Sequence, residues 1–171
     1  MKIWSILFLL SFSVLAGCTS GQKKSDPRRK PDKNEMADLN RYMVQKDKER
    51  ILNYLERKNL KMSESPSGLW YLIKSEGNGR LFTDFDVIKT DYECSLLDGT
   101  VCYSSETTGP REIVLGRSPV EAGLDQGLRM LKPGGEAVFI IPPFLAWGLK
   151  GDGNKIPSRS ILVYKVKIYH N

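Results

Sequence analysis

The chain has 171 residues, with 26 Lys and Arg against 20 Asp and Glu, which gives a net charge of +6. Most of this excess lies in residues 23–33, so we expect no nucleic-acid binding by the rest of the chain. The single histidine, His170, stands next to the C-terminus, which argues against a Ser-His-Asp triad, a Cys-His pair or a zinc site. We therefore expect neither a metal nor a cofactor.

The N-terminus carries a short positive start, Met1-Lys2, followed by an apolar run over residues 3–15. This run is shorter than the roughly 20 residues that a membrane-spanning helix needs. The next residues, 15–18 (LAGC), resemble a bacterial lipoprotein signal, with cleavage before Cys18 and lipid on its sulfur. A signal-anchor is the alternative. No Asp follows Cys18, so we expect an outer-membrane location on the periplasmic side of the envelope.

Residues 1–17 are thus predicted as a signal peptide, and residues 18–34 as the lipidated cysteine with a flexible basic tether. The tether contains Gly21, Pro27 and Pro31 and few apolar side chains, so it cannot build a core. Such a segment spans roughly 20–25 Å on average. It would let the remainder of the chain stand off the membrane.

Residues 35–62 are predicted as an N-terminal helix. Apolar side chains recur at helical spacing in its two halves, but the charged residues 45–50 interrupt the stripe. The helix either packs on its own domain or pairs with a second copy of the chain, which would make a homodimer. The apolar positions are Met36, Leu39 and Met43 in the first half and Ile51, Tyr54 and Leu55 in the second.

Residues 63–171 are predicted as one α+β domain. Alternating apolar and polar residues indicate strands near 69–73, 86–97, 101–105, 112–115, 136–141 and 161–169. Asp98-Gly99 is a hairpin turn signal. Residues 123–131 predict a short helix with leucines on one face. The pattern is a mostly antiparallel sheet that covers one short helix.

Residues 139–148 (FIIPPFLAWG), 156–157 (IP) and 161–166 (ILVYKV) follow one another as strand, loop and closing strand. With several further motifs of this domain, they resemble the FKBP-type peptidyl-prolyl isomerases. The similarity covers about residues 68–169, and its specificity lies in the order and spacing of the motifs. It implies an FKBP-like antiparallel sheet wrapped over one short helix, with a proline-sized cleft. The matching segments are Tyr92, Asp98-Gly99, Ser104-Ser105, Leu115-Gly116, Val120, Gly123, 139–148 (FIIPPFLAWG), 156–157 (IP) and 161–166 (ILVYKV).

A narrower resemblance is to the FKBP-type lipoproteins associated with gliding motility in the Bacteroidetes. It rests on Cys18, the charged stretch before the domain, and segments such as 96–105 (LLDGTVCYSS). It implies a role in folding envelope or secreted proteins, or in a motility or secretion machine.

The pocket departs from the family pattern at several positions. Where the family has a phenylalanine and an aspartate before the serine pair, this chain has Cys102 and Tyr103. These departures favour a site with weakened or specialised catalysis. The other changes are Arg111 for a phenylalanine, Glu121 for an isoleucine, Leu124 for a tryptophan, Trp147 for a tyrosine and Tyr164 for a phenylalanine.

Rotation about an Xaa–Pro bond faces a barrier of about 20 kcal/mol and breaks no bond. A site that binds the twisted amide better than the planar one is sufficient. The resemblance implies that the backbone N–H of Glu121 holds the substrate carbonyl, and Tyr103 and Tyr164 remain as side-chain donors. The predicted walls and floor are Tyr92, Val120, Leu124, Trp147, Ile156 and Tyr164.

Two functions therefore stay open. The first is a peptidyl-prolyl cis-trans isomerase that acts on proline-containing unfolded or secreted polypeptides. The second is a non-catalytic peptide-binding or assembly module on the same scaffold.

Cys94 and Cys102 stand four residues on either side of Asp98. On adjacent antiparallel strands this spacing predicts that they face each other within bridging reach. In an oxidising envelope compartment a disulfide is expected. The alternative is a pair of buried thiols in the sheet.

Overall fold

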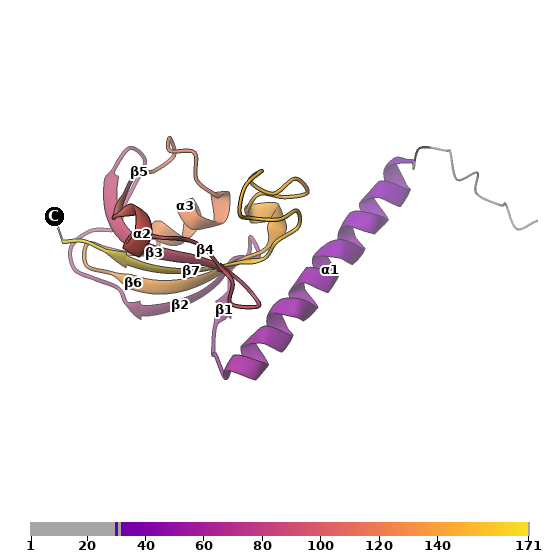
Figure 1. Ribbon diagram of the computed structural model, residues 1–171, viewed down its shortest axis with the longest axis horizontal. Helices are drawn as coiled ribbons and strands as arrows, with labels where there is room; N and C mark the ends of the chain where they lie inside the picture. The colour runs from indigo at the N-terminus through magenta and orange to yellow at the C-terminus, as the bar shows by residue number, and fades with distance from the viewer. Residues whose placement is uncertain (1–29, 31, 171) are drawn as a thin grey trace, which may run out of the picture.

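The computed structural model of the chain describes residues 30 and 32–170, drawn in colour in Figure 1. The predicted signal peptide, Cys18 and most of the predicted tether lie outside these residues. Within them, no helix is both long and apolar enough to cross a membrane. Figure 1 shows a long helix, α1, whose N-terminal end projects away from a β-rich domain.

Helix α1 spans Lys33–Lys58 and has a defined cap at each end. The Asp32 side chain accepts hydrogen bonds from the backbone of Asn34 and Glu35, and the Glu35 side chain accepts one from the Asp32 backbone. Asn59 ends the helix in the left-handed conformation, at φ 49°. The helix therefore begins two residues before the predicted start and ends four residues before the predicted end.

Seven strands form one antiparallel sheet in the order β1-β2-β6-β7-β3-β4, and β5 pairs with β3. Apart from β1, which was not predicted, their bounds follow the predicted segments closely, and β6 has the predicted bounds. The strands are β1 (Ser63–Glu64), β2 (Trp70–Ser75), β3 (Val87–Leu96), β4 (Val101–Ser104), β5 (Arg111–Val114), β6 (Glu136–Ile141) and β7 (Leu162–Ile168).

The centre of the sheet is covered on both faces, so β6 is apolar and buried from Ala137 to Ile141. On one face, helix α3 (Ala122–Leu128) packs Leu124 and Leu128 against the core that contains Phe139. On the other face, Ile51 and Leu55 of α1 pack on β2, β6 and β7. The second half of α1 thus packs on its own domain.

Two short helices were not predicted. Helix α2 (Ser105–Thr108) follows β4 directly, because the Ser104 side chain accepts a hydrogen bond from the Glu106 backbone and caps it. The 3-10 helix η1 (Pro143–Leu145) has proline at its first position. It begins the loop that leads to Trp147.

The structure corrects the predicted disulfide. Cys94 pairs with Tyr103 and Ser95 pairs with Val101, so Cys102 is the extra residue of a β-bulge and does not face Cys94. Both cysteines are free thiols, buried in the core. Burial raises the pKa of Cys94 to about 12 and also raises that of Cys102.

Candidate functional site

The eight predicted site residues lie on three strands, one helix entry and one loop. Six of them belong to or pack against the core around α3, and Glu121 is hydrogen-bonded to Trp147 and Tyr164. The residues come from β3 (Tyr92), β4 (Tyr103), the entry to α3 (Val120, Glu121, Leu124), the loop after β6 (Trp147, Ile156) and β7 (Tyr164). We call residues 142–157 the rim loop, and we call the surface that the eight residues share the cleft, after the proline-sized cleft that the resemblance implies.

The floor of the cleft is apolar and aromatic. Leu124 and Ile156 are buried, and the rings of Tyr92 and Tyr164 stack with centroids 6.4 Å apart and planes 29° apart. Burial raises the pKa of the Tyr164 hydroxyl, and the neighbouring Glu121 carboxylate raises it further. Tyr164 therefore stays a neutral hydrogen-bond donor throughout the physiological pH range.

The side chain of Glu121 is the centre of a buried polar network that the sequence did not predict. Its Oε1 accepts hydrogen bonds from the Tyr164 hydroxyl at 2.7 Å and from Trp147 Nε1 at 2.8 Å. The residue is only 5% exposed, and Oε2 has no hydrogen-bond partner among the described residues. A buried acceptor without a hydrogen-bond partner costs about 1–3 kcal/mol of folding free energy. The unpaired Oε2 is therefore an unusual feature of this site.

Tyr103 is hydrogen-bonded to the rim loop. Its hydroxyl donates to Asp152 Oδ2, and Asp152 Oδ1 accepts from the backbone N–H groups of Asn154 at 2.9 Å and Ile156 at 2.8 Å. Burial opposes ionisation of Asp152, but these hydrogen bonds outweigh it and hold its pKa below the ordinary value. Tyr103 thus fixes the turn that presents Ile156 to the cleft.

These contacts change the expected role of the two tyrosine hydroxyls. Tyr103 donates to Asp152, and Tyr164 donates to Glu121. Neither is free to donate to a substrate in this structure. The backbone N–H of Glu121, in contrast, donates to no group of the described residues and remains available for the predicted contact with a substrate carbonyl.

Trp147 forms the exposed edge of the cleft and is 40% exposed. The loop reaches this position through Gly148, which has a left-handed φ of 60°, favourable for glycine. The Gly148 N–H donates to the Pro143 carbonyl, and its own carbonyl accepts from the Arg159 backbone. These two backbone hydrogen bonds therefore hold the loop that carries the Trp147 indole.

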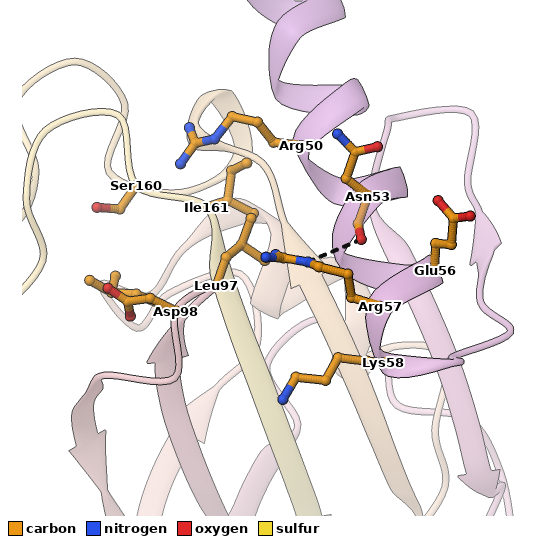
Figure 2. Close-up of a pocket in the computed structure, with 10 residues that line it drawn as sticks. Arg50, Asn53, Glu56, Arg57, Lys58, Leu97, Asp98, Ser160 and Ile161 are labelled. Atoms are coloured by element: carbon orange, nitrogen blue, oxygen red, sulfur yellow. Dashed lines mark hydrogen bonds between the residues drawn. The ribbon is translucent and has the colours of Figure 1, made fainter.

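A large hollow of the described structure lies elsewhere. It has a volume of about 1020 Å³ and separates the second half of α1 from the β3–β4 hairpin and the residues before β7. Figure 2 shows Arg50, Arg57 and Lys58 beside this hollow, with Asp98 across from them. It contains none of the predicted site residues, and its charged, open walls differ from the apolar floor of the cleft.

Comparison with known proteins places the domain in a family. Residues 79–169 match the model of the FKBP-type peptidyl-prolyl cis-trans isomerases. A probable FKBP-type isomerase, FkpA, of Neisseria meningitidis serogroup B is 41% identical over 102 residues, which are 60% of this chain and 37% of that protein. A probable FKBP-type isomerase of Haemophilus influenzae is 35% identical over 116 residues, 67% of this chain and 46% of that protein.

The chain therefore spans less than half the length of these two relatives. Among solved structures, FkpA from Escherichia coli superposes with a TM-score of 0.65 at 28% identity, over 79% of this chain and 63% of that chain. AtFKBP13 superposes with a TM-score of 0.58 at 32% identity, over 63% of this chain and 96% of that one. The predicted α+β fold, an FKBP-like antiparallel sheet with an N-terminal helix, is thereby confirmed.

Proposed function

Because the chain belongs to the FKBP-type peptidyl-prolyl cis-trans isomerase family, we propose that its cleft binds Xaa–Pro segments and catalyses their cis–trans isomerisation. One observation carries the proposal. Tyr92, Leu124, Ile156 and Tyr164 pack in one core cluster, Tyr164 contacts the Glu121 side chain, and the Glu121 N–H donates to no group of the described residues. This combination suits a proline ring and the carbonyl that precedes it.

The mechanism needs no covalent step. The planar amide is held by resonance, and the barrier of about 20 kcal/mol arises from losing it. An apolar cleft favours the twisted amide, whose carbonyl is less polar, and the Glu121 N–H holds that carbonyl while the bond rotates. Since the Tyr103 and Tyr164 hydroxyls have other partners, we expect slower catalysis than a site with free donors would give.

The competing function is a non-catalytic peptide-binding or assembly module on the same scaffold. The substitutions at Cys102, Tyr103 and Leu124 favour it, because they rebuild one wall of the cleft. Proline-limited refolding of a small protein, followed without protease, separates the two. Accelerated refolding supports the isomerase; refolding at the uncatalysed rate, with clear binding to a permanently unfolded chain, supports the binding module.

We further propose that the protein is lipid-anchored at Cys18, on the periplasmic face of the outer membrane, and assists the folding of envelope or secreted proteins. A role in gliding motility or secretion is the narrower form of this proposal. Its support is the sequence of residues 15–18 and the basic stretch after it. Labelled palmitate should enter the wild-type protein and not a Cys18→Ser variant; equal labelling would contradict the anchor.

We propose that the chain forms a homodimer through α1, because apolar residues in the first half of this helix are exposed. Met36, Leu39 and Tyr42 are 52%, 49% and 60% exposed, and a second copy would cover them. Sedimentation velocity should show a dimer that a Leu39→Glu substitution dissociates. A monomeric wild-type protein at micromolar concentration would contradict this assembly.

A further inference from the structure

The hollow between the second half of α1 and the β3–β4 hairpin has an apolar floor. Leu96 and Leu97 are half-buried at the end of β3, and Ile161 is buried just before β7. Its volume of about 1020 Å³ is that of a large ligand pocket. A single small ion would leave this floor unused, whereas a segment of polypeptide can cover it with apolar side chains.

The wall that α1 contributes to the hollow is cationic. Arg50 and Arg57 lie two turns apart on one face of the helix, and Lys58 follows them. Figure 2 shows that Arg57 and Lys58 extend from α1 towards the hollow, whereas the carboxylate of Glu56 is turned to the other side of the helix. The positive groups therefore face a bound molecule.

Two of these cations have no ionic partner in the described part of the chain. Arg57 donates through Nε to the Asn53 carbonyl at 3.3 Å, and neither Arg57 nor Lys58 takes part in any ion pair of the described residues. Arg50 lies 3.5 Å from the Asp47 carboxylate and keeps 56% of its side chain exposed. These charges are thus available to carboxylates of a ligand.

The opposite wall of the hollow is anionic. The Asp98 carboxylate accepts a hydrogen bond from the Thr100 N–H at 2.9 Å, and this bond holds its pKa below the ordinary value. Asp98 is therefore ionised at neutral pH and repels acidic groups from the hairpin. Carboxylates that enter the hollow are directed to the α1 wall.

We propose that this hollow is a second polypeptide-binding site, separate from the cleft, which takes an extended acidic segment that contains no required proline. Its carboxylates bind Arg57 and Lys58, and its apolar side chains cover Leu97 and Ile161. Successive side chains of an extended segment point to opposite sides. A segment that alternates acidic and apolar residues therefore satisfies the cationic wall and the apolar floor together.

Charge and position argue against two other occupants. The chain's own segment 23–33 is basic, so the α1 wall repels it. At 1.5 Å per residue, Arg57 lies about 36 Å along the helix from Lys33. A membrane that holds the chain by its N-terminus would meet the other end of α1 first, so a lipid headgroup fits this position less well than a polypeptide.

Binding of proline-free peptides to the full chain tests the site. The probe is a fluorescein-labelled peptide of about eight residues, roughly 26 Å when extended, that alternates glutamate with leucine. The matched peptide has lysine in place of glutamate. By fluorescence anisotropy, the glutamate peptide should bind at least fivefold more tightly, because two exposed ion pairs act together. Added salt should reduce this ratio.

The double substitution Arg57→Gln/Lys58→Gln is the decisive variant. It removes both unpaired cations and keeps residues of similar helix propensity, and we expect the glutamate-to-lysine affinity ratio to fall at least threefold. Lys89→Gln/Arg117→Gln is the matched control. It removes the same two charges from exposed residues that do not line the hollow, and it should keep the wild-type ratio.

NMR chemical shifts locate the bound peptide. With the glutamate peptide, amide signals of residues 50–58, 96–98 and 160–161 should move, and that of Trp147 should not. Equal affinities for the two peptides, an unchanged ratio in the decisive variant, or shifts confined to the cleft would overturn the proposal. Because the probes lack proline, none of these results decides whether the cleft is an isomerase.

Two further results would overturn the proposal in favour of another occupant. Binding of phosphatidylglycerol vesicles but not of the peptide, lost in Arg57→Gln/Lys58→Gln, would assign the hollow to a lipid headgroup. A dimer that the same variant dissociates in sedimentation velocity, without peptide binding by the wild-type protein, would assign it to a second copy of the chain.

Discussion

At the level of single residues, the side-chain donors of Tyr103, Tyr164 and Trp147 are paired with carboxylates before any substrate arrives. Tyr103 holds Asp152, and Tyr164 and Trp147 hold Glu121. Each pair links a strand or helix entry to the rim loop or to β7. The tyrosines that replace an aspartate and a phenylalanine of the family pattern thus organise the cleft.

Removing the Tyr103 hydroxyl should loosen the rim loop. In Tyr103→Phe, Asp152 loses its side-chain donor, and we expect the free energy of unfolding to fall by about 1–2 kcal/mol, measured by urea denaturation. Tyr169→Phe is the matched control, because the Tyr169 hydroxyl also donates to a carboxylate, Asp91, but at an exposed site. Its effect on stability should be clearly smaller than that of Tyr103→Phe. Equal effects of the two variants would contradict the role of Tyr103.

Alkaline pH should destabilise the protein through Cys94. Burial raises the pKa of this thiol from 9.0 to about 12 in the folded protein, so the unfolded chain loses the proton first. The stability that the protonated Cys94 thiol contributes is complete below pH 9. It is lost as the pH rises towards 12, and the free energy of unfolding falls by up to about 1.4 kcal/mol per pH unit. The raised pKa of Tyr164 acts in the same direction.

Denaturation curves between pH 8 and 11 check this expectation. Cys94→Ala removes the thiol, so its free energy of unfolding should fall less steeply above pH 9 than that of the wild-type protein. Parallel slopes for the two proteins would show that Cys94 does not cause the effect.

At the level of elements, α1 is fixed to the domain by a buried ion pair as well as by apolar packing. Asp47 is 4% exposed, and its Oδ2 accepts from Arg159 Nη2 at 2.7 Å. Arg159 stands in the loop before β7, at a left-handed φ of 56°. The contact thus joins the charged middle of the helix to the segment that follows the rim loop.

Asp47→Ala should release the first half of α1. Removing one partner of a fully buried pair costs roughly 3–5 kcal/mol; Arg159 keeps 28% exposure, so we expect about 1–3 kcal/mol. Amide hydrogen exchange of residues 36–47 should accelerate, while β6 stays protected. Asp38→Ala, which removes an exposed pair with Arg41 on the same helix, is the control. Unchanged exchange in Asp47→Ala would contradict this docking role.

Elements with strong local signals could be predicted from the sequence. Strand β6 was predicted with its observed bounds, because Gly134-Gly135 precedes it and Pro142 follows it. Strand β1 could not be found, since its two residues are strand only through pairing with Tyr71 and Trp70. The bulge at Cys102 also escaped prediction, because hairpin spacing alone does not reveal an extra residue.

The candidate site, too, could be predicted only in part. Motif spacing predicted which backbone segments form the site. The structure places six of the eight residues in or against one core and joins Glu121 to Trp147 and Tyr164 by hydrogen bonds. The side-chain contacts of Glu121 were not predicted, because its partners lie 26 and 43 residues away and depend on how the rim loop is placed. An acidic residue at an otherwise apolar pocket position was the available signal.

At the level of the whole molecule, the two faces of the sheet carry different elements. One face carries α3, the cleft and the rim loop, and the other carries the second half of α1. Figure 1 shows the first half of α1 extending beyond the domain. The arrangement leaves the cleft unobstructed by the part of α1 that packs on the sheet, so a chain held at its N-terminus can still present the cleft to a polypeptide.

The central claim is that this cleft isomerises prolyl bonds, and exchange spectroscopy by NMR on an Xaa–Pro peptide tests it most directly. The wild-type protein should accelerate cis–trans exchange at catalytic concentration. Trp147→Ala should lower kcat/KM at least tenfold, whereas Leu149→Ala, which changes a 71% exposed residue of the same loop, should leave it unchanged. Exchange at the uncatalysed rate with wild-type protein, or equal rates for wild type and Trp147→Ala, would contradict the account.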